Sequence, residues 1–221
     1  ITVTMPGTGE VLTTVVDGDG NWSVTPTQAL ADGTANVTVV AADPAGNVSP
    51  SVNVAVTIDT TAPTAPAADV AAASDTGASN TDNITRDNTP TISGGAATPG
   101  DTITVTMPGT GEVLTAVVAS DGTWSVTPTQ ALADGTRNIS VTATDPAGNV
   151  SPATTVPVVI DTTAPAAPVA DVAASSDTGS SNIDNNTSDA TPTISGTGTA
   201  GDTITVTMPG TGEVLTTVVD G

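Results

Sequence analysis

The sequence predicts an all-β fold in which antiparallel β-sandwich domains follow one another in tandem. Three observations lead to this prediction: a long internal repeat, short segments in which apolar and polar residues alternate, and clusters of turn residues between those segments. Alternation with a period of two is typical of strands that bury one face. No part of the chain shows the helical period of an amphipathic segment, so we expect no helix.

The internal repeat has the length of a whole domain. Residues 1–94 match residues 103–196 at 72 of 94 positions, and Ile1–Gly18 returns unchanged as Ile204–Gly221. Solenoid repeats are shorter, at about 20–50 residues, whereas about 100 residues can form a hydrophobic core of their own. We therefore expect a slice of a tandem array built from one type of domain.

The domain boundaries are predicted from the segment Ile-Asp-Thr-Thr-Ala-Pro, which occurs at 58–63 and at 160–165. In each copy an alternating segment ends there and a stretch rich in Pro and Ala begins. Proline fixes φ and removes a backbone donor, so this stretch is the expected linker. We expect a C-terminal part of one repeat in residues 1–60, a complete repeat in residues 61–160, and the N-terminal part of the next in residues 161–221.

Seven short strands are expected in residues 61–160. In the segment 102–107, for example, Ile103, Val105 and Met107 alternate with threonines. Turn residues such as Gly, which tolerates positive φ, separate the segments. Seven β-branched strands joined by turns predict an immunoglobulin-like antiparallel sandwich. The expected strands are 65–73, 91–94, 102–107, 113–118, 124–126, 137–144 and a last one ending at 160, with a polar loop at 74–89.

The composition restricts the function. The chain has 23 acidic and two basic residues, a net charge of −21, and no Cys or His. Such a charge repels nucleic acid and anionic membrane surfaces, so we expect neither as a partner, and no membrane insertion. Catalysis is not expected either, because the chain lacks His, Lys and Cys as bases or nucleophiles. Its two arginines, Arg86 and Arg137, align with Ser188 and Ala35 in the other copy.

Aspartates are expected to gather at both ends of the complete sandwich. If its strands run up and down, successive loops lie alternately at the two ends, next to the linkers. Close packing of like charges is costly unless a cation neutralises them. The candidate ligands are Asp59, Asp101, Asp121, Asp145 and Asn149 at the first junction, Asp75, Asp82, Asn83, Asp87 and Asp161 at the second, and Asp43, Asn47, Asp177 and Asp184 in the flanking copies.

Calcium is the expected ion, since oxygen ligands without His or Cys favour Ca²⁺ over zinc or copper. The pairs expected to contribute most are Asp59 with Asp145, and Asp161 with Asp75 and Asp82. The alternative for any single residue is a structural one, because Asp and Asn side chains also stabilise turns by bonding their own backbone.

The large apolar side chains are expected in the core. We expect Trp22 and Trp124 to pack between the sheets, although an exposed Trp could stack on a sugar. Met5, Met107 and Met208 alternate with Ile and Val, which favours core packing.

Several ordered motifs carry a resemblance that covers the whole chain. They are Asp-Gly-Thr-Trp-Ser-Val-Thr at 121–127, Ala-Leu-Ala-Asp-Gly-Thr at 131–136, Thr-Asp-Pro-Ala-Gly-Asn-Val-Ser-Pro at 144–152, and the linker segment. Together they resemble the bacterial Ig-like repeats of giant type I secreted, RTX-type surface adhesins and biofilm-associated proteins. The resemblance implies calcium-binding domains that form an extender on the bacterial cell surface, between a membrane-anchored end and a ligand-binding tip.

The sequence therefore predicts a secreted structural extender that is rigidified by calcium at its domain junctions. Its direct partners are expected to be the neighbouring repeats, while the ligand of the tip lies outside this segment. Two alternatives remain: a multivalent module that binds glycan or protein, and an extracellular filament. In the filament, strands of 161–221 would complete the 1–60 part of another chain.

Overall fold

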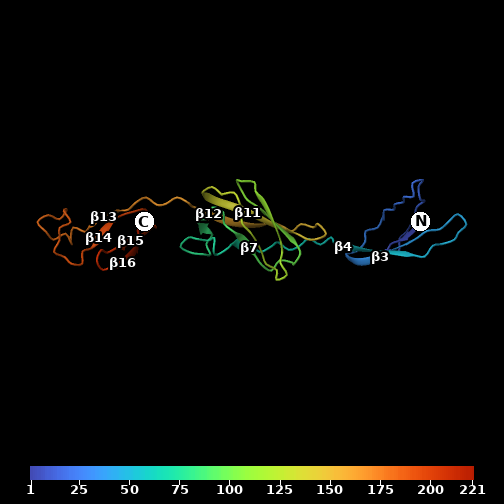
Figure 1. The fold of residues 1–221 in the computed structure, drawn as a ribbon, viewed down its shortest axis with the longest axis horizontal. Helices are drawn as coiled ribbons and strands as arrows, with labels where there is room; N and C mark the ends of the chain where they lie inside the picture. Colours follow the sequence, from blue (N-terminus) through green and yellow to red (C-terminus); the bar gives the residue numbers. More distant parts are fainter. The chain divides into compact units, whose positions relative to one another are not determined.

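The computed structural model describes residues 1–221 and contains strands and loops only, which confirms the all-β prediction (Figure 1). The chain divides into two compact units, residues 1–162 and residues 163–221. With strands as the only regular elements, the chain has no helix long and apolar enough to span a membrane.

Residues 61–160 form a sandwich of two sheets. The smaller sheet has the strand order β10-β7-β5 and the larger one β6-β12-β11-β8-β9. Every pairing is antiparallel except that of β6 with β12. The strands are β5 (Asp69–Val70), β6 (Ile84–Thr85), β7 (Ile92–Gly94), β8 (Thr102–Thr106), β9 (Val113–Val117), β10 (Trp124–Val126), β11 (Gly135–Thr144) and β12 (Thr154–Ile160).

All seven expected strands are present, and β6 is an addition. It lies in the segment 74–89, which was expected to be a loop, and pairs in parallel with the end of β12. Its two residues are too short to show alternation in the sequence. It forms because Thr85 is buried and donates its hydroxyl to the carbonyl of Ser74 at 2.5 Å. The N–H of Asp161 in turn donates to the carbonyl of Thr85 at 2.9 Å.

The core of this sandwich lies between its two sheets. Alternate residues of each strand point inward, and Ile92, Ile103, Val141 and Val158 have almost no exposed surface. Burial of each such side chain stabilises the fold by about 1.5–3 kcal/mol. Trp124 is 5% exposed and belongs to the same cluster, as expected.

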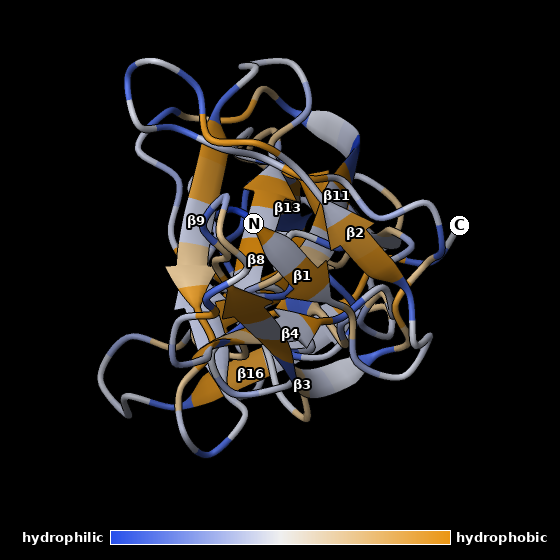
Figure 2. Ribbon diagram, turned by 90° about the vertical axis from the view of Figure 1, so that its right-hand side faces the viewer, coloured by the Kyte–Doolittle hydropathy of each residue, from blue (hydrophilic) through white to orange (hydrophobic).

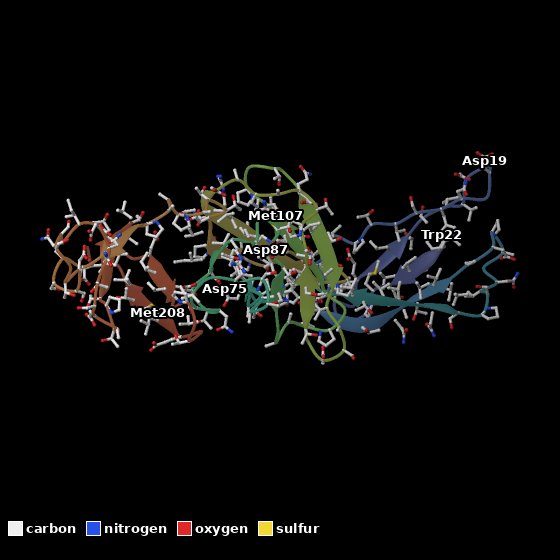
Figure 3. The ribbon with its side chains drawn as sticks, turned by 60° about the vertical axis from the view of Figure 1, so that its left-hand side comes forward. Asp19, Trp22, Asp75, Asp87, Met107 and Met208 are labelled. Carbon is white, nitrogen blue, oxygen red and sulfur yellow. The ribbon has the colours of Figure 1, made fainter.

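Residues 1–60 form one four-stranded sheet with the order β2-β1-β3-β4. Val3, Met5 and Val37 are its most buried apolar residues. Trp22 is 42% exposed, so its expected core position is wrong (Figure 3). The reason is that no second sheet within residues 1–60 covers it. The strands are β1 (Thr2–Thr4), β2 (Val11–Thr13), β3 (Gly33–Val40) and β4 (Val52–Ile58).

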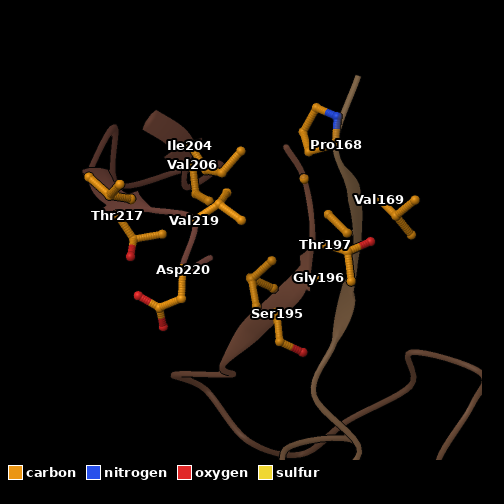
Figure 4. A pocket seen from close by; sticks show the side chains of 14 residues that line it. Pro168, Val169, Ser195, Gly196, Thr197, Ile204, Val206, Thr217, Val219 and Asp220 are labelled. Atoms are coloured by element: carbon orange, nitrogen blue, oxygen red, sulfur yellow. The ribbon is translucent and has the colours of Figure 1, made fainter. Parts of the chain in front are cut away.

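Residues 163–221 form two small sheets, each of two strands. A cavity of about 460 Å³ is lined by residues of both sheets, including Gly196 and Val206 (Figure 4). In the repeat, Gly196 corresponds to Gly94, against which Trp124 packs in the complete sandwich. The cavity is therefore the interior of a sandwich rather than a ligand pocket. The strands are β13 (Val169–Val172), β14 (Ile194–Thr197), β15 (Thr203–Thr207) and β16 (Val214–Val218).

The contact between Gly94 and Trp124 gives a stability prediction. A Cβ at Gly94 would lie 1.9 Å from the carbonyl oxygen of Ala67 and 2.7 Å from Nε1 of Trp124. We expect Gly94→Ala to lower the free energy of unfolding by about 2–3 kcal/mol, measured by urea titration with tryptophan fluorescence. The control is Gly95→Ala, because nothing lies within 4 Å of a Cβ there. Equal stability of the two variants would contradict this packing.

Candidate functional site

The linker and the loop between β11 and β12 meet at the first end of the complete sandwich. In this loop the Asp145 carboxylate accepts hydrogen bonds from the backbone N–H of Asn149 at 2.9 Å and from its side-chain amide at 2.8 Å. The same amide donates to the backbone carbonyl of Asp59 in the linker at 3.0 Å. Asn149 therefore connects the loop to the linker and fixes the orientation of Asp145.

Asp101, which directly precedes β8, lies near enough to Asp59 and Asp145 for their charges to act on it. Only 2% of its surface is exposed. Burial raises the pKa of Asp101, and the negative charges of Asp145 and Asp59 raise it further. The pKa of Asp145 is lowered, chiefly by the hydrogen bond from the Asn149 side chain. This end of the domain thus holds a buried carboxylate near two further negative charges, and a bound cation would lower the cost of ionising it.

A second arrangement of oxygen atoms lies in the loop between β5 and β6. Asp75 is 3% exposed, and one of its carboxylate oxygens, Oδ2, accepts from the N–H of Asn83 at 3.0 Å (Figure 3). The other oxygen, Oδ1, is buried without a hydrogen-bond partner, as is the side-chain oxygen of Asn83. Unpartnered buried oxygens are costly, which indicates a missing positively charged or donor group.

The same arrangement recurs in residues 163–221. Asp177 is 4% exposed, its Oδ2 accepts from the N–H of Asn185 at 3.0 Å, and its Oδ1 is buried without a partner. Asn83 and Asn185 both have left-handed backbone, with φ of 60° and 59°. Asparagine tolerates this conformation better than most residues. The geometry is therefore a property of the repeat and occurs in both copies of this loop.

Several of the other predicted ligands form turns. In each case a carboxylate oxygen accepts the N–H two residues further along the chain, as expected for the structural alternative. These contacts are Asp43 with Ala45, Asp82 with Ile84, Asp87 with Thr89, Asp121 with Thr123 and Asp184 with Asn186. Asp43 also bonds the Asn47 side chain at 2.7 Å, which repeats the pair of Asp145 with Asn149.

Asp161, which was predicted to group with Asp75 and Asp82, is connected to the loop of Asp75 through the backbone. Asp161 reaches the loop through its backbone bond to Thr85, and Thr85 bonds Ser74 beside Asp75. Nowhere in the chain do three or more acidic side chains converge as a ready-made metal-binding group. A metal at either end would therefore need amide or backbone oxygens, or water, in addition to carboxylates.

The linkers are also bonded back to the domain that precedes them, which the sequence analysis missed. Asp32 accepts from the N–H and hydroxyl of Thr60 at 3.1 and 2.9 Å, and from the hydroxyl of Thr61 at 2.9 Å. In the next copy, Asp134 accepts from the N–H and hydroxyl of Thr162 at 3.2 and 2.9 Å. The hydroxyls of Thr60 and Thr61 lower the pKa of Asp32. The signal in the sequence is the recurrence of Asp-Gly and Asp-Thr-Thr at a fixed spacing.

The structure thus contains one complete β-sandwich, with further copies of the same repeat before and after it in the chain and linkers that are hydrogen-bonded to the domains. The family model described as "Bacterial Ig-like domain" matches residues 1–60, 61–162 and 163–221. The chain belongs to the bacterial Ig-like domain family, which confirms the family resemblance seen in its motifs.

Three solved structures are among those similar to this chain. The first is a tetra-tandem repeat in the extending region of a large adhesion protein, with 24% identity and a TM-score of 0.36 over 99% of this chain and 54% of that one. The second is a Ca²⁺-stabilised adhesin that helps an Antarctic bacterium reach out and bind ice, with 29% identity and a TM-score of 0.35 over 99% and 54%. The third is the BSP domain of a biofilm-associated protein, with 21% identity and a TM-score of 0.30 over 74% and 25%.

This chain spans about half the length of the first two structures. The search of curated proteins gives no match.

The opposite pKa shifts at the first end give a pH prediction. Because the pKa of Asp101 is raised on folding, its protonated form stabilises the fold, and this contribution is lost as pH rises through that raised pKa. We expect Asp101→Asn, measured with chelator present, to be more stable than the parent at pH 7. The difference should vanish below the ordinary Asp pKa of 3.8, where the parent is protonated in both states.

The matched variant is Asp145→Asn, which we expect to be less stable than the parent at pH 7. The pKa of Asp145 is lowered, so its ionised form contributes stability at neutral pH that is lost as pH falls through the lowered pKa. Thermal unfolding from pH 3 to pH 8 compares the two variants. A loss of stability at pH 7 in Asp101→Asn would contradict the raised pKa of the Asp101 carboxyl.

Proposed function

We propose that this chain is part of the stalk of a bacterial cell-surface adhesin. In this role it is a row of domains that holds a separate adhesive tip away from the cell, with calcium bound at the domain ends. The observation that carries the proposal is the attachment of the linkers. The carboxylates of Asp32 and Asp134 each bond the linker residues that follow their own domain. A linker that is bonded in this way has less freedom to bend than a free polar chain.

The contact of Asn149 with Asp59 supports the same role from the other side of the linker. The linker is bonded to the preceding sheet through Thr60 and Thr61, and to the following sandwich through the carbonyl of Asp59. Both contacts lie within three residues of chain. A short connection that is bonded at both of its ends is the arrangement expected for transmitting orientation from one domain to the next.

Calcium is the cation that best suits these ends. The donor atoms are carboxylate, amide and backbone oxygens, and the chain has no His or Cys. Ca²⁺ accepts six to eight oxygens in flexible geometry, whereas Mg²⁺ demands a near-ideal octahedron and retains water. The unpartnered oxygens of Asp75 and Asn83 are the first ligands we assign, and the corresponding Asp177 is the counterpart in the next copy. Asp101, which is 2% exposed and has the negative charges of Asp145 and Asp59 nearby, is the second position we assign.

The alternative of a binding module finds less support in the geometry. The cavity beside Gly196 has the position of a sandwich interior, and the tryptophan of the complete sandwich is buried. The exposed tryptophan of the chain, Trp22, lies in residues 1–60, where no second sheet covers it, so the complete sandwich has no exposed aromatic side chain on which a sugar could stack. No catalytic role is proposed, because the chain offers no His, Lys or Cys.

Removal of calcium tests the proposed stalk. A ligand that binds only the folded state stabilises it by RT ln(1 + [L]/Kd), about 2.7 kcal/mol when its concentration is 100 times Kd. We therefore expect EGTA to lower the melting temperature by several degrees, and small-angle scattering to show a shorter, more flexible particle. A chain whose melting temperature and scattering are unchanged by EGTA has no calcium-stiffened junctions.

The ligand assignment is tested by a double variant, Asp75→Asn with Asp177→Asn, which keeps the shape of both side chains and removes their charges. We expect most of the calcium-induced rise in melting temperature to be lost. The matched control is Asp121→Asn, since Asp121 is exposed and only caps a turn through Thr123. If the control loses as much of the calcium response as the double variant, the assignment is wrong.

A further inference from the structure

The strand β9 presents an uncharged edge to the surroundings. It is the last strand of the larger sheet and pairs with β8 on one side only. Its residues are Val-Leu-Thr-Ala-Val, without a charge or a proline, and the hydropathy colouring shows no hydrophilic segment along it (Figure 2). Val113 and Val117 are 58% and 68% exposed. Proteins usually protect such edges with charges, prolines or bulges, because unpaired strands associate with other strands.

The register shows which backbone groups point outward. In the antiparallel pair of β8 and β9, Val105 lies opposite Leu114 and Thr104 lies opposite Thr115. The register continues at both ends, where the N–H of Met107 donates to the carbonyl of Glu112 and the N–H of Val118 donates to the carbonyl of Asp101. Hydrogen-bonded and non-hydrogen-bonded pairs alternate in antiparallel sheets, so Leu114 and Ala116 bond β8. The N–H and C=O groups of 113, 115 and 117 therefore point to the open side.

We propose that this edge pairs in antiparallel orientation with the same edge of a second copy of the chain. The sequence of β9 is symmetric about Thr115 in its outward residues. Antiparallel pairing places Thr115 opposite Thr115 of the partner copy, and Val113 opposite Val117 of the partner copy. Each of these pairs can exchange two backbone hydrogen bonds, which gives the two-fold symmetry of a self-complementary interface.

The acidic residues next to the strand favour antiparallel over parallel pairing with a second copy. In the register centred on Thr115, Glu112 lies opposite Val118 of the partner copy, and Asp121 lies opposite Gly109 of the partner copy. No acidic residue then faces another, although the chain has a net charge of −21. Glu112 is also held by Thr129, whose N–H and hydroxyl donate to its carboxylate at 3.0 and 2.6 Å. A parallel pairing would instead bring Glu112 beside Glu112 of the partner copy, which is destabilising.

The edge recurs in each copy of the repeat. The corresponding positions are Val11, Thr13 and Val15 in residues 1–60, and Val214, Thr216 and Val218 in residues 163–221. All four of these valines are exposed. One such strand pair buries less than the about 1,000 Å² that a stable interface needs, so a single contact is weak. Because the chain carries three such edges, linked contacts can add to the overall affinity without any new type of contact. The proposal does not depend on calcium or on the stalk function.

Sedimentation velocity on the whole chain tests the pairing. In calcium and about 0.5 M salt, which screens the net charge, we expect the weight-average mass to rise above 21.2 kDa with concentration. The triple variant Thr13→Lys, Thr115→Lys, Thr216→Lys places two like charges opposite each other at the centre of every contact. We expect this variant to remain at the mass of a single chain.

The matched control is Thr4→Lys, Thr106→Lys, Thr207→Lys. These positions are exposed on the strands next to the edge and add the same charge. We expect this control to associate as the parent does. A parent chain that stays monomeric up to about 0.5 mM overturns the proposal. So does an equal loss of association in both triple variants, because the contact would then lie elsewhere.

Discussion

Burial of carboxylates without a positively charged partner is the constraint on which the ends of these domains depend. Asp101 is almost fully buried next to the charges of Asp59 and Asp145, and Asp75 is buried with one oxygen unpartnered. The whole chain of 221 residues has only two basic side chains, so it cannot neutralise these carboxylates by itself. The apolar core between the sheets offsets their cost, and a cation bound at these ends would add to the stability of the fold.

The linkers next to these carboxylates are themselves held by hydrogen bonds. Asp32 and Asp134 hold the residues that leave each domain, and Asn149 holds the carbonyl of Asp59 as the chain enters the next one. These neutral and charge-assisted bonds restrain the linker without a metal. Calcium at the adjacent carboxylates would add to the restraint, so the two contributions act on the same few residues.

Strand positions could be predicted well, because alternation and turn residues are local signals, and all seven expected strands of the complete sandwich are present. The two-residue strand β6 could not, since it depends on the buried hydroxyl of Thr85. Trp22 was misplaced because burial depends on a facing sheet. At the candidate site, the positions of the aspartates in loops predicted which of them could serve as ligands, and residue type alone could not rank them. It could not separate the buried Asp75 from turn formers such as Asp121, because both follow polar residues and precede a glycine within two positions.

Anomalous scattering from a crystal of this chain grown with calcium tests whether these carboxylates bind the ion. We expect peaks in the anomalous difference map at about 2.3–2.6 Å from Oδ1 of Asp75 and from the side-chain oxygen of Asn83, with a matching peak beside Asp177. A map in millimolar calcium without a peak at either loop, or at the group of Asp59, Asp101 and Asp145, would contradict this expectation.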